Sequence, residues 1–332
     1  MKMFNTKITG TGKYHPKRVM SNDEISEMVD TTDEWIIQRT GIKERRISDP
    51  ETEYPSAMAT HAAKEAIKNA GIEPNDISMI IFSVTISDYV FPGTSTQLQT
   101  ALGITNQCAC LDINAACTGW VYGLQMADAL IKTGVHKHIL LVGTEMTSAF
   151  NNWQDRSTCV LFGDGSGVSV LSRSEDESGP KFIDTILGCD GSKAESLIRF
   201  KGGAKFPIDK EILEKREHYI TMDGQVVFKN AVKTMSRHCA TLLERNNISK
   251  EEVDWFIPHQ ANLRIIETTA KLLDFPMEKV IVNVEKYANT SSASIPAALH
   301  EAVMDGRIKR GQTLLFAAFG AGLTSGAVLL KY

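Results

Sequence analysis

The sequence repeats one helix–turn–strand pattern at a nearly constant distance along the chain. The segment NAGIEPNDISMIIFS aligns with RNNISKEEVDWFIPH so that Ile77 pairs with Val253, a shift of 176 positions. The segment HILLVG aligns with QTLLFA, and there the shift from Ile139 to Thr313 is 174 positions. Two separated blocks with almost the same shift indicate an internal duplication. A chance match between two ordinary α/β units is the alternative.

Each copy of the pattern alternates helices with buried strands. Continuous apolar runs predict strands over 77–84, 139–143, 253–258 and 313–319. Helices are predicted over 57–70, 118–132, 231–245 and 293–304. We therefore expect an α/β fold of two similar halves, 1–175 and 176–332, each a sheet covered by helices. The boundary is expected in the polar stretch 172–181.

One segment departs from this regular pattern. Residues 190–215 are rich in Gly and Lys and predict an irregular excursion. Long loops of this kind often bind ligands, and a solvated surface insertion is the other interpretation.

Composition excludes several classes of function. The 332 residues include 36 basic and 40 acidic side chains, so no bulk basicity indicates nucleic-acid binding. No apolar run approaches the roughly 20 residues of a membrane helix, and residues 1–10 lack the apolar core of a signal peptide. We expect a cytoplasmic protein without membrane insertion. Its six cysteines lack paired CxxC spacing, which predicts free thiols and no zinc site.

One of these cysteines, Cys117, lies where a strand and a tight turn lead into a helix. In the segment LDINAACTGW the thiol falls at the helix N-terminus, where the helix dipole and free N–H groups are expected to lower its pKa. The small neighbours Ala115, Ala116 and Gly119 leave room for a substrate. Cys117 is therefore a candidate nucleophile, although a cysteine is more often a small buried hydrophobe.

Two polar residues of the second half are candidates to act with Cys117. His259 follows the strand predicted over 253–258, and ligands in open α/β sheets bind at such strand ends. Asn289 precedes a helix whose small residues resemble those after Cys117. Taken alone, the histidine would be a packed or surface residue and the asparagine a helix cap. Across a pseudo-twofold interface, however, two nitrogen donors would face a thiolate able to hold an acyl group.

Several blocks of the chain resemble the signature blocks of the β-ketoacyl-[acyl-carrier-protein] synthase III family of the thiolase superfamily. They are DTTDEWIIQRTGIKERR, NAACTGW, FGDGSG, HYITMDGQVVFKNAV, PHQANLRI, ANTSSASIPAAL and FGAGLTSG. The resemblance runs from about residue 7 to the C-terminus. It implies the thiolase fold, which has five layers (αβαβα) and duplicated halves, and a homodimer. By itself FGDGSG is also typical of a phosphate loop, but it lacks the lysine and the spacing of a P-loop.

The resemblance also implies a reaction, the decarboxylative Claisen condensation. An acyl group passes from coenzyme A to Cys117, and malonyl-[acyl-carrier-protein] then binds. His259 and Asn289 hydrogen-bond its thioester carbonyl during decarboxylation, and the resulting carbon attacks the acyl group. The products are 3-oxoacyl-[acyl-carrier-protein], CO2 and coenzyme A, and the reaction initiates type II fatty acid synthesis. The acyl-CoA thioester is a substrate, and neither a cofactor nor a metal is implied.

Residues for transition-state and coenzyme A binding follow from the same resemblance. The backbone N–H groups of Cys117 and Ala321 would form an oxyanion hole. Many relatives have Gly where Ala321 stands, and Ala serves there if its φ is negative. Trp35 and Arg156 would flank the coenzyme A adenine through stacking and cation–π contact, whereas a partly buried helix anchor is the ordinary role of Trp35.

Contacts with macromolecules are implied in the same way. Phe91 would reach the acyl pocket of the partner subunit, although it would be unremarkable as a core phenylalanine. A basic patch would receive the acidic carrier protein through charge steering, and a solvated helix face is its ordinary interpretation. The residues implied for carrier-protein binding are Lys229, Gln260, Arg264 and Lys271.

Sequence details separate this activity from its alternatives. A degradative thiolase needs a second cysteine in the block FGAGLTSG, and elongating synthases use a second histidine where this chain has Asn289. A non-catalytic partner subunit usually loses the nucleophile, which is present here. The alternative that remains is a specialised synthase III-like acyltransferase or condensing enzyme with an unusual acyl substrate. Chain length and branching of the acyl-CoA primer do not follow from the sequence.

Overall fold

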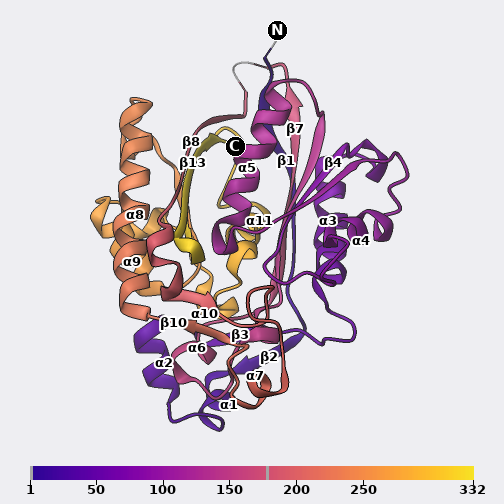
Figure 1. Cartoon of the computed structure of the whole chain (residues 1–332). Coiled ribbons are helices and arrows are strands. Elements are labelled where there is room, and N and C mark those ends of the chain that lie inside the picture. Colours follow the sequence, from indigo (N-terminus) through magenta and orange to yellow (C-terminus); the bar gives the residue numbers. More distant parts are fainter. Residues whose placement is uncertain (1–2, 177–178) are drawn as a thin grey trace.

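The computed structural model describes residues 3–176 and 179–332, and the first of its two main sheets is built from the first half of the chain (Figure 1). Its strands are β1 (Asn5–Tyr14), β4 (Met79–Ser83), β5 (Ala109–Ile113), β6 (His138–Glu145) and β7 (Gly165–Ser174). They lie in the order β1-β7-β6-β4-β5. β7 is antiparallel to both β1 and β6, whereas β4 is parallel to β5 and β6.

The second sheet is built from the second half of the chain. Its strands are β8 (Lys181–Cys189), β11 (Trp255–Pro258), β12 (Thr313–Gly320) and β13 (Thr324–Lys331). They lie in the order β11-β12-β13-β8, with β11 parallel to β12 and the other pairs antiparallel. The strands β8, β13, β12 and β11 thus repeat the order and directions of β1, β7, β6 and β4. The segments that align in sequence are the ones that occupy equivalent places in the two sheets.

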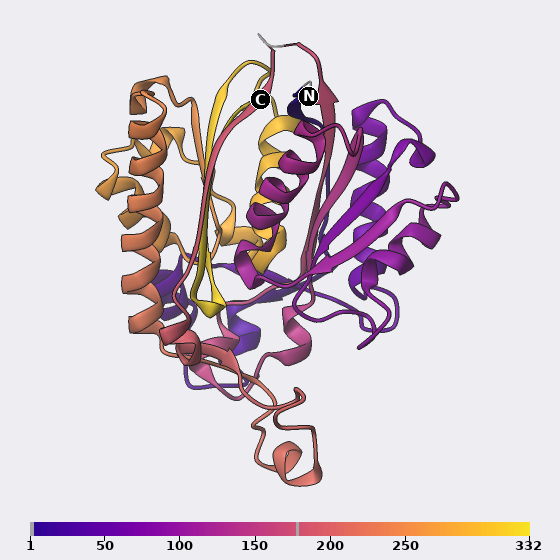
Figure 2. The same cartoon turned by 45° about the horizontal axis from the view of Figure 1, so that its top comes forward.

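Six helices complete five layers around the two sheets. They are α3 (Pro55–Ala70), α4 (Thr94–Ala101), α5 (Gly119–Lys132), α8 (Gly224–Arg245), α9 (Leu263–Leu272) and α11 (Ser294–Met304). Figure 2 shows α5 and α11 between the sheets, with α8 and α9 outside the second sheet and α3 and α4 outside the first. The predicted α/β fold with αβαβα layering is therefore confirmed.

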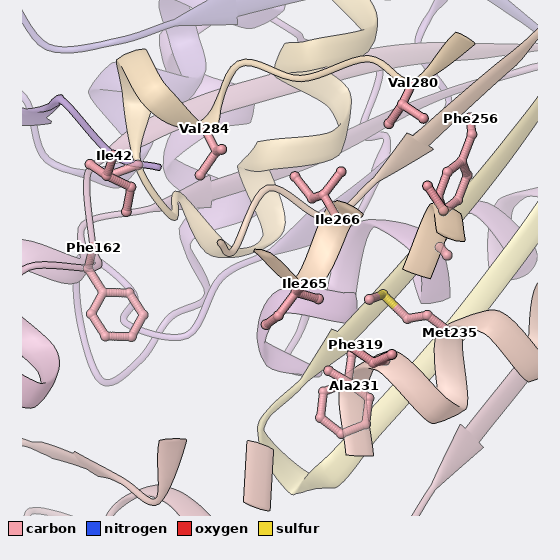
Figure 3. Packing of buried hydrophobic residues seen from close by; sticks show 14 of the residues in the cluster. Ile42, Phe162, Ala231, Met235, Phe256, Ile265, Ile266, Val280, Val284 and Phe319 are labelled. Atoms are coloured by element: carbon pink, nitrogen blue, oxygen red, sulfur yellow. The ribbon is translucent and has the colours of Figure 1, made fainter. Parts of the chain in front are cut away.

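Strands that are buried on both faces explain this layering. Along β4, Ile80 and Phe82 belong to the core under α3, whereas Ile81 between them belongs to the core around α5 and α11. Along β12, Leu315 packs toward α8 and α9, and Phe316 packs toward the central helices. Successive side chains of a strand point to opposite faces, so an uninterrupted apolar run requires a helical layer on each side. Figure 3 shows the core that contains Phe256 and Phe319 of the second half, to which Ile42 and Phe162 of the first half also contribute.

Shorter helices and strands lie around the two main sheets. The helices are α1 (Asn22–Ser26), α2 (Asp33–Thr40), α6 (Arg156–Cys159), α7 (Lys210–Glu214) and α10 (Val284–Tyr287). Two small sheets pair β2 (Arg18–Ser21) with β3 (Glu44–Ile47) and β9 (Leu197–Arg199) with β10 (Ile220–Met222). Single turns of 3₁₀ helix, η2 (Ala116–Thr118), η7 (Ser291–Ala293) and η8 (Ala321–Leu323), lie where the halves meet.

The structure differs from the sequence predictions in two segments. α8 begins at Gly224 rather than at residue 231, because the Asp223 side chain caps it by accepting from the N–H groups of Gln225 and Val226. Segment 190–215 is not wholly irregular, since it contains β9 and α7, which projects from the body in Figure 2. Residues 1 and 2 of the segment 1–10, and residues 177 and 178 of the predicted boundary, lie outside the described residues. In the described chain, no helix combines the length and apolar character of a membrane span.

Candidate active site

Cys117 lies at the junction between the first sheet and the central helix α5, as predicted. After β5 the chain turns sharply, with Ala116 in the left-handed region at φ 46°, and Cys117 follows in η2 directly before α5. Gly119 brings this junction close to the end of β4, because a Cβ at Gly119 would lie 1.7 Å from the Ser83 Oγ. The tight turn and the close approach together fix the position of the thiol.

His259 lies at the end of β11, where a serine of the central helix α11 orients its ring. Its Nδ1 is 2.6 Å from the Ser294 Oγ, and the N–H of Gln260 donates to the same oxygen over 3.3 Å. Because this oxygen already accepts one hydrogen bond, its own hydrogen is best placed to be donated to Nδ1. The imidazole then carries its proton on Nε2. Burial lowers the pKa of His259 to about 3, so the ring is neutral at physiological pH.

Asn289 is held by backbone bonds to the block FGDGSG. Its N–H donates to the Leu161 carbonyl over 2.9 Å, and its carbonyl accepts from the Gly163 N–H over 3.0 Å. Its side-chain Oδ1 accepts from the Ser291 N–H over 2.8 Å, which leaves the Nδ2 amide as a donor. The block FGDGSG is thus packed against Asn289 and has a structural role here. A Cβ at Gly163 would lie 2.5 Å from the Tyr287 carbonyl oxygen.

The three predicted residues line one cavity of about 270 Å³ between the halves. Gly320 also lines it and lies against the nucleophile, because a Cβ there would lie 2.9 Å from the Cys117 backbone nitrogen. Ala321 follows at the start of η8, and it is not among the described residues with positive φ. The backbone condition for using its N–H is therefore met.

The protonation state of Cys117 differs from the sequence prediction. The residue is half-buried in the wall of the cavity, and desolvation by the surrounding protein raises the pKa of the thiol to about 12. The nearby Glu145 carboxylate raises this pKa further, while the Ser291 hydroxyl and the Cys117 N–H lower it. A helix N-terminus contributes about 1 kcal/mol, which is less than the cost of burying an isolated anion. The expected lowering of the pKa was wrong, and the resting thiol is protonated.

The two residues expected at coenzyme A lie together at the same cavity. The Arg156 guanidinium lies 4.9 Å from the centre of the Trp35 ring, and both side chains line the cavity. Arg156 also donates to the Asp30 carbonyl over 2.8 Å, which holds the guanidinium in place. Residues 121 positions apart thus form one aromatic and cationic surface.

Three of the four residues expected to bind the carrier protein are exposed on neighbouring helices. Lys229 lies on α8, and Arg264 and Lys271 lie on α9, which packs beside α8 (Figure 1). Gln260 does not belong to this surface. It is 1% exposed. Its side-chain Nε2 donates to the carbonyls of Pro258 and Ile281, and its Oε1 accepts from the backbone N–H groups of residues 283 and 284. Gln260 therefore braces the chain beside His259, and its predicted contact with the carrier protein is withdrawn.

Phe91 is separate from the cavity within one chain. It is 83% exposed, and the neighbouring Tyr89 and Val90 are exposed as well. The interpretation of Phe91 as a core residue is therefore wrong. Its side chain belongs to an apolar loop tip.

Sequence reasoning missed residues that support the three candidates. Ser294 orients His259, Ser291 contacts both Cys117 and Asn289, and Glu145 lies fully buried behind them. A signal was present for Glu145, since it ends a buried strand on the side where ligands bind. Among the described residues, no group of three or more His, Cys, Asp or Glu side chains is arranged to hold a metal ion.

Known proteins share these features. Residues 111–191 match the family model "3-Oxoacyl-[acyl-carrier-protein (ACP)] synthase III", and residues 243–332 match the model of its C-terminal part. The beta-ketoacyl-[acyl-carrier-protein] synthase III of Caldanaerobacter subterraneus is 45% identical, over 98% of this chain and 97% of that protein. The crystal structure of the Aquifex aeolicus synthase III is 46% identical, with a TM-score of 0.90 over 98% of this chain and 100% of that chain. A priming β-ketosynthase of the R1128 polyketide pathway is 32% identical, with a TM-score of 0.90 over 99% and 97%.

The layered fold is that of a thiolase-fold condensing enzyme, an acyltransferase. Within that class, the chain belongs to the β-ketoacyl-[acyl-carrier-protein] synthase III family.

Proposed function

We propose that the protein condenses an acyl-CoA primer with malonyl-[acyl-carrier-protein], giving 3-oxoacyl-[acyl-carrier-protein], CO2 and coenzyme A. The observation that carries this proposal is the meeting of Cys117, His259 and Asn289 in one cavity. The three residues come from two halves, which we propose to be 1–175 with the nucleophile and 176–332 with the two donors. The product is the first intermediate of type II fatty acid synthesis.

In the first half-reaction, the Cys117 sulfur attacks the thioester carbonyl of acyl-CoA. Negative charge develops on the carbonyl oxygen, and the N–H groups of Cys117 and Ala321 would receive it. The close approach of Gly320 to Cys117, with Ala321 next in the chain, supports this role. The carbon–sulfur bond to coenzyme A breaks, and an acyl thioester remains on Cys117. Such covalent catalysis divides one difficult transfer into two easier steps.

In the second half-reaction, the malonyl thioester carbonyl lies between His259 and Asn289. The neutral imidazole donates from Nε2 and the amide donates from Nδ2, so both stabilise the enolate that forms as CO2 leaves. The enolate carbon attacks the acyl group, and the bond between that acyl carbon and the Cys117 sulfur breaks. The thiolate that leaves takes a proton from solvent, so the thiol is regenerated. Ser294 and Ser291 support this step by orienting the two donors.

Substrate binding uses the surfaces around the cavity. Trp35 and Arg156 would hold the coenzyme A adenine by stacking and cation–π contact. The exposed cations Lys229, Arg264 and Lys271 would steer the acidic carrier protein to the same cavity. A homodimer would cover the apolar tip at Phe91, and a cytoplasmic location fits the six free thiols.

A second candidate function keeps the same chemistry with a different primer. The likeness to a priming β-ketosynthase of a polyketide pathway supports a specialised condensing enzyme that loads an unusual acyl group. A panel of acyl-CoA primers, straight and branched, assayed with malonyl-[acyl-carrier-protein] and analysed by product mass separates the two. Preference for acetyl-CoA or a short branched primer favours fatty acid synthesis, and preference for another acyl group favours the specialised role.

The nucleophile assignment is tested by replacing Cys117 with alanine. Incubation with acyl-CoA should add one acyl mass to the wild-type protein and none to Cys117→Ala, as measured by intact-protein mass spectrometry. Cys189→Ala is the matched control, because Cys189 is an exposed thiol that should not be needed for loading. Acylation of Cys117→Ala at the wild-type rate would contradict the proposal.

A further inference from the structure

A buried carboxylate behind Cys117 has no part in the mechanism described so far. Glu145 ends β6 and is 0% exposed. Its Oε1 accepts from the Thr85 hydroxyl over 2.9 Å, and its Oε2 accepts from the Thr85 N–H over 3.1 Å. No ion pair within the described part of the chain includes Glu145. A buried carboxylate without a cation is costly and is kept where it has a use.

Glu145 is connected to Cys117 through one hydroxyl. The Ser291 Oγ donates to the Glu145 Oε1 over 3.2 Å, and the same hydroxyl also interacts with the Cys117 thiol, whose pKa it lowers. Ser292 also donates toward this oxygen over 3.3 Å, but its hydroxyl lies equally close to the Ser83 carbonyl. The path from sulfur to carboxylate therefore runs through Ser291.

The surroundings of Glu145 make this path suited to proton movement. Thr85 after β4 and Ser291 and Ser292 of η7 are neutral, so Cys117 of η2 is the titratable group that faces the carboxylate. Burial raises the pKa of Glu145 to about 7, and the ionised carboxylate raises the pKa of Cys117. The enclosed site thus favours a single negative charge. Moving one proton from the sulfur to the carboxylate keeps that charge constant.

We propose that Glu145 accepts the Cys117 thiol proton through the Ser291 hydroxyl when the acyl group is loaded. This inference rests on the proposed function and adds a proton relay to its first half-reaction. The thiol proton passes to Ser291 Oγ, and the Ser291 hydroxyl proton passes to Glu145 Oε1. The Cys117 sulfur forms its bond to the acyl carbon, and the bond from that carbon to the coenzyme A sulfur breaks. The proton returns through Ser291 to the departing sulfur, so coenzyme A leaves as the thiol and Glu145 is again ionised.

The relay predicts the pH dependence of loading. Glu145 must be ionised to accept a proton, so the rate of acyl-Cys117 formation should rise with pH through a midpoint near 7. Rapid-quench mass spectrometry between pH 5.5 and 8.5 measures this rate. Glu145→Gln should lower it about 100-fold at pH 8 and remove the midpoint, since general-base catalysis contributes at least that much.

Ser291→Ala provides an independent test, because it interrupts the path while the carboxylate stays in place. The loading rate of this variant should fall by the same factor, and its rise with pH through a midpoint near 7 should disappear. The matched control is Ser292→Ala, which removes a donor to the same oxygen but no atom of the path. It should keep the rise with pH and move its midpoint upward, because the carboxylate loses a hydrogen bond.

Two results would overturn the relay. One is loading by Glu145→Gln and Ser291→Ala with the wild-type rate and midpoint. The other is an equal fall of loading and of malonyl decarboxylation in both variants, which indicates damage to the whole site. Thermal unfolding of each variant checks its fold. Failure of the proposed function is recognised separately, because Cys117→Ala would then still be acylated.

Discussion

The His259 imidazole is neutral in this site because burial disfavours its charged form. With its pKa lowered to about 3, the ring stays uncharged from pH 8 down to pH 5. A protonated ring would place a cation in the cavity that Cys117 also lines. It would carry a proton on both nitrogens, so Nδ1 could no longer accept a hydrogen bond from Ser294. In the unfolded chain the His259 imidazole binds a proton near pH 6.5, whereas in the folded protein it does so only near pH 3. The free energy of unfolding therefore decreases as the pH falls below about 6.5.

Removal of either donor should separate the two half-reactions. His259→Ala and Asn289→Ala should each slow malonyl decarboxylation about 100-fold, because each loses one hydrogen bond to the enolate oxygen. Formation of acyl-Cys117 should fall much less, since its oxyanion is held by backbone N–H groups. Carbon dioxide release and intact-protein mass measure the two steps. An equal loss in both steps would contradict the assigned role.

At the scale of elements, the neighbouring helices α8 and α9 divide their residues between core and surface. Their apolar faces, with Met235 and Ile265, pack into the outer core near Phe319 (Figure 3). Their cations face outward beside the cavity, and the Arg264 guanidinium lies 5.7 Å from the centre of the Phe228 ring. These cations are exposed although the whole chain has a net charge of −4.

Charge reversal on α9 should weaken docking of the carrier protein alone. Arg264→Glu should raise the KM for malonyl-[acyl-carrier-protein] roughly ten-fold at low salt, and the difference should shrink as salt screens the charges. The KM for acyl-CoA should not change. Lys137→Glu, an exposed change directly before β6, is the control. Equal KM values for the carrier protein in wild type and Arg264→Glu would remove α9 from the docking surface.

For the whole molecule, the site exists because two halves of the chain pack against each other. Cys117 directly precedes the central helix α5 and Ser294 begins the central helix α11. The Ser291 hydroxyl of η7 reaches Glu145 at the buried end of β6. In the first half, Tyr89, Val90 and Phe91 form an apolar tip that is 59%, 103% and 83% exposed. Adjacent large side chains exposed to this degree are typical of a surface that another chain covers.

A charge at this tip should weaken the proposed homodimer. Light scattering should give a dimer for the wild type, and Phe91→Asp should increase the monomer fraction because a buried interface disfavours an unpaired charge. Activity at low protein concentration should fall together with the dimer. Val135→Asp, at an exposed apolar residue after α5, is the control. A wild-type monomer, or a Phe91→Asp dimer of unchanged affinity, would contradict this role.

The amino-acid sequence alone determined the alternation of helices and strands and the duplication. Both depend on local periodicity and on similarity between segments, which need no coordinates. The positions of Cys117, His259 and Asn289 at strand and helix junctions followed from the same patterns. Start and end points were predicted less well, because a single side chain such as Asp223 can cap and lengthen a helix.

Only the tertiary structure decided the electrostatics of the site and its supporting residues. Desolvation depends on how many atoms surround a group, so the predicted position of Cys117 at a helix N-terminus did not reveal the high pKa of its thiol. Burial also removed Gln260 from the surface and placed Glu145 within reach of Ser291. These contacts join residues 21 and 146 positions apart, and tertiary packing rather than local sequence creates them.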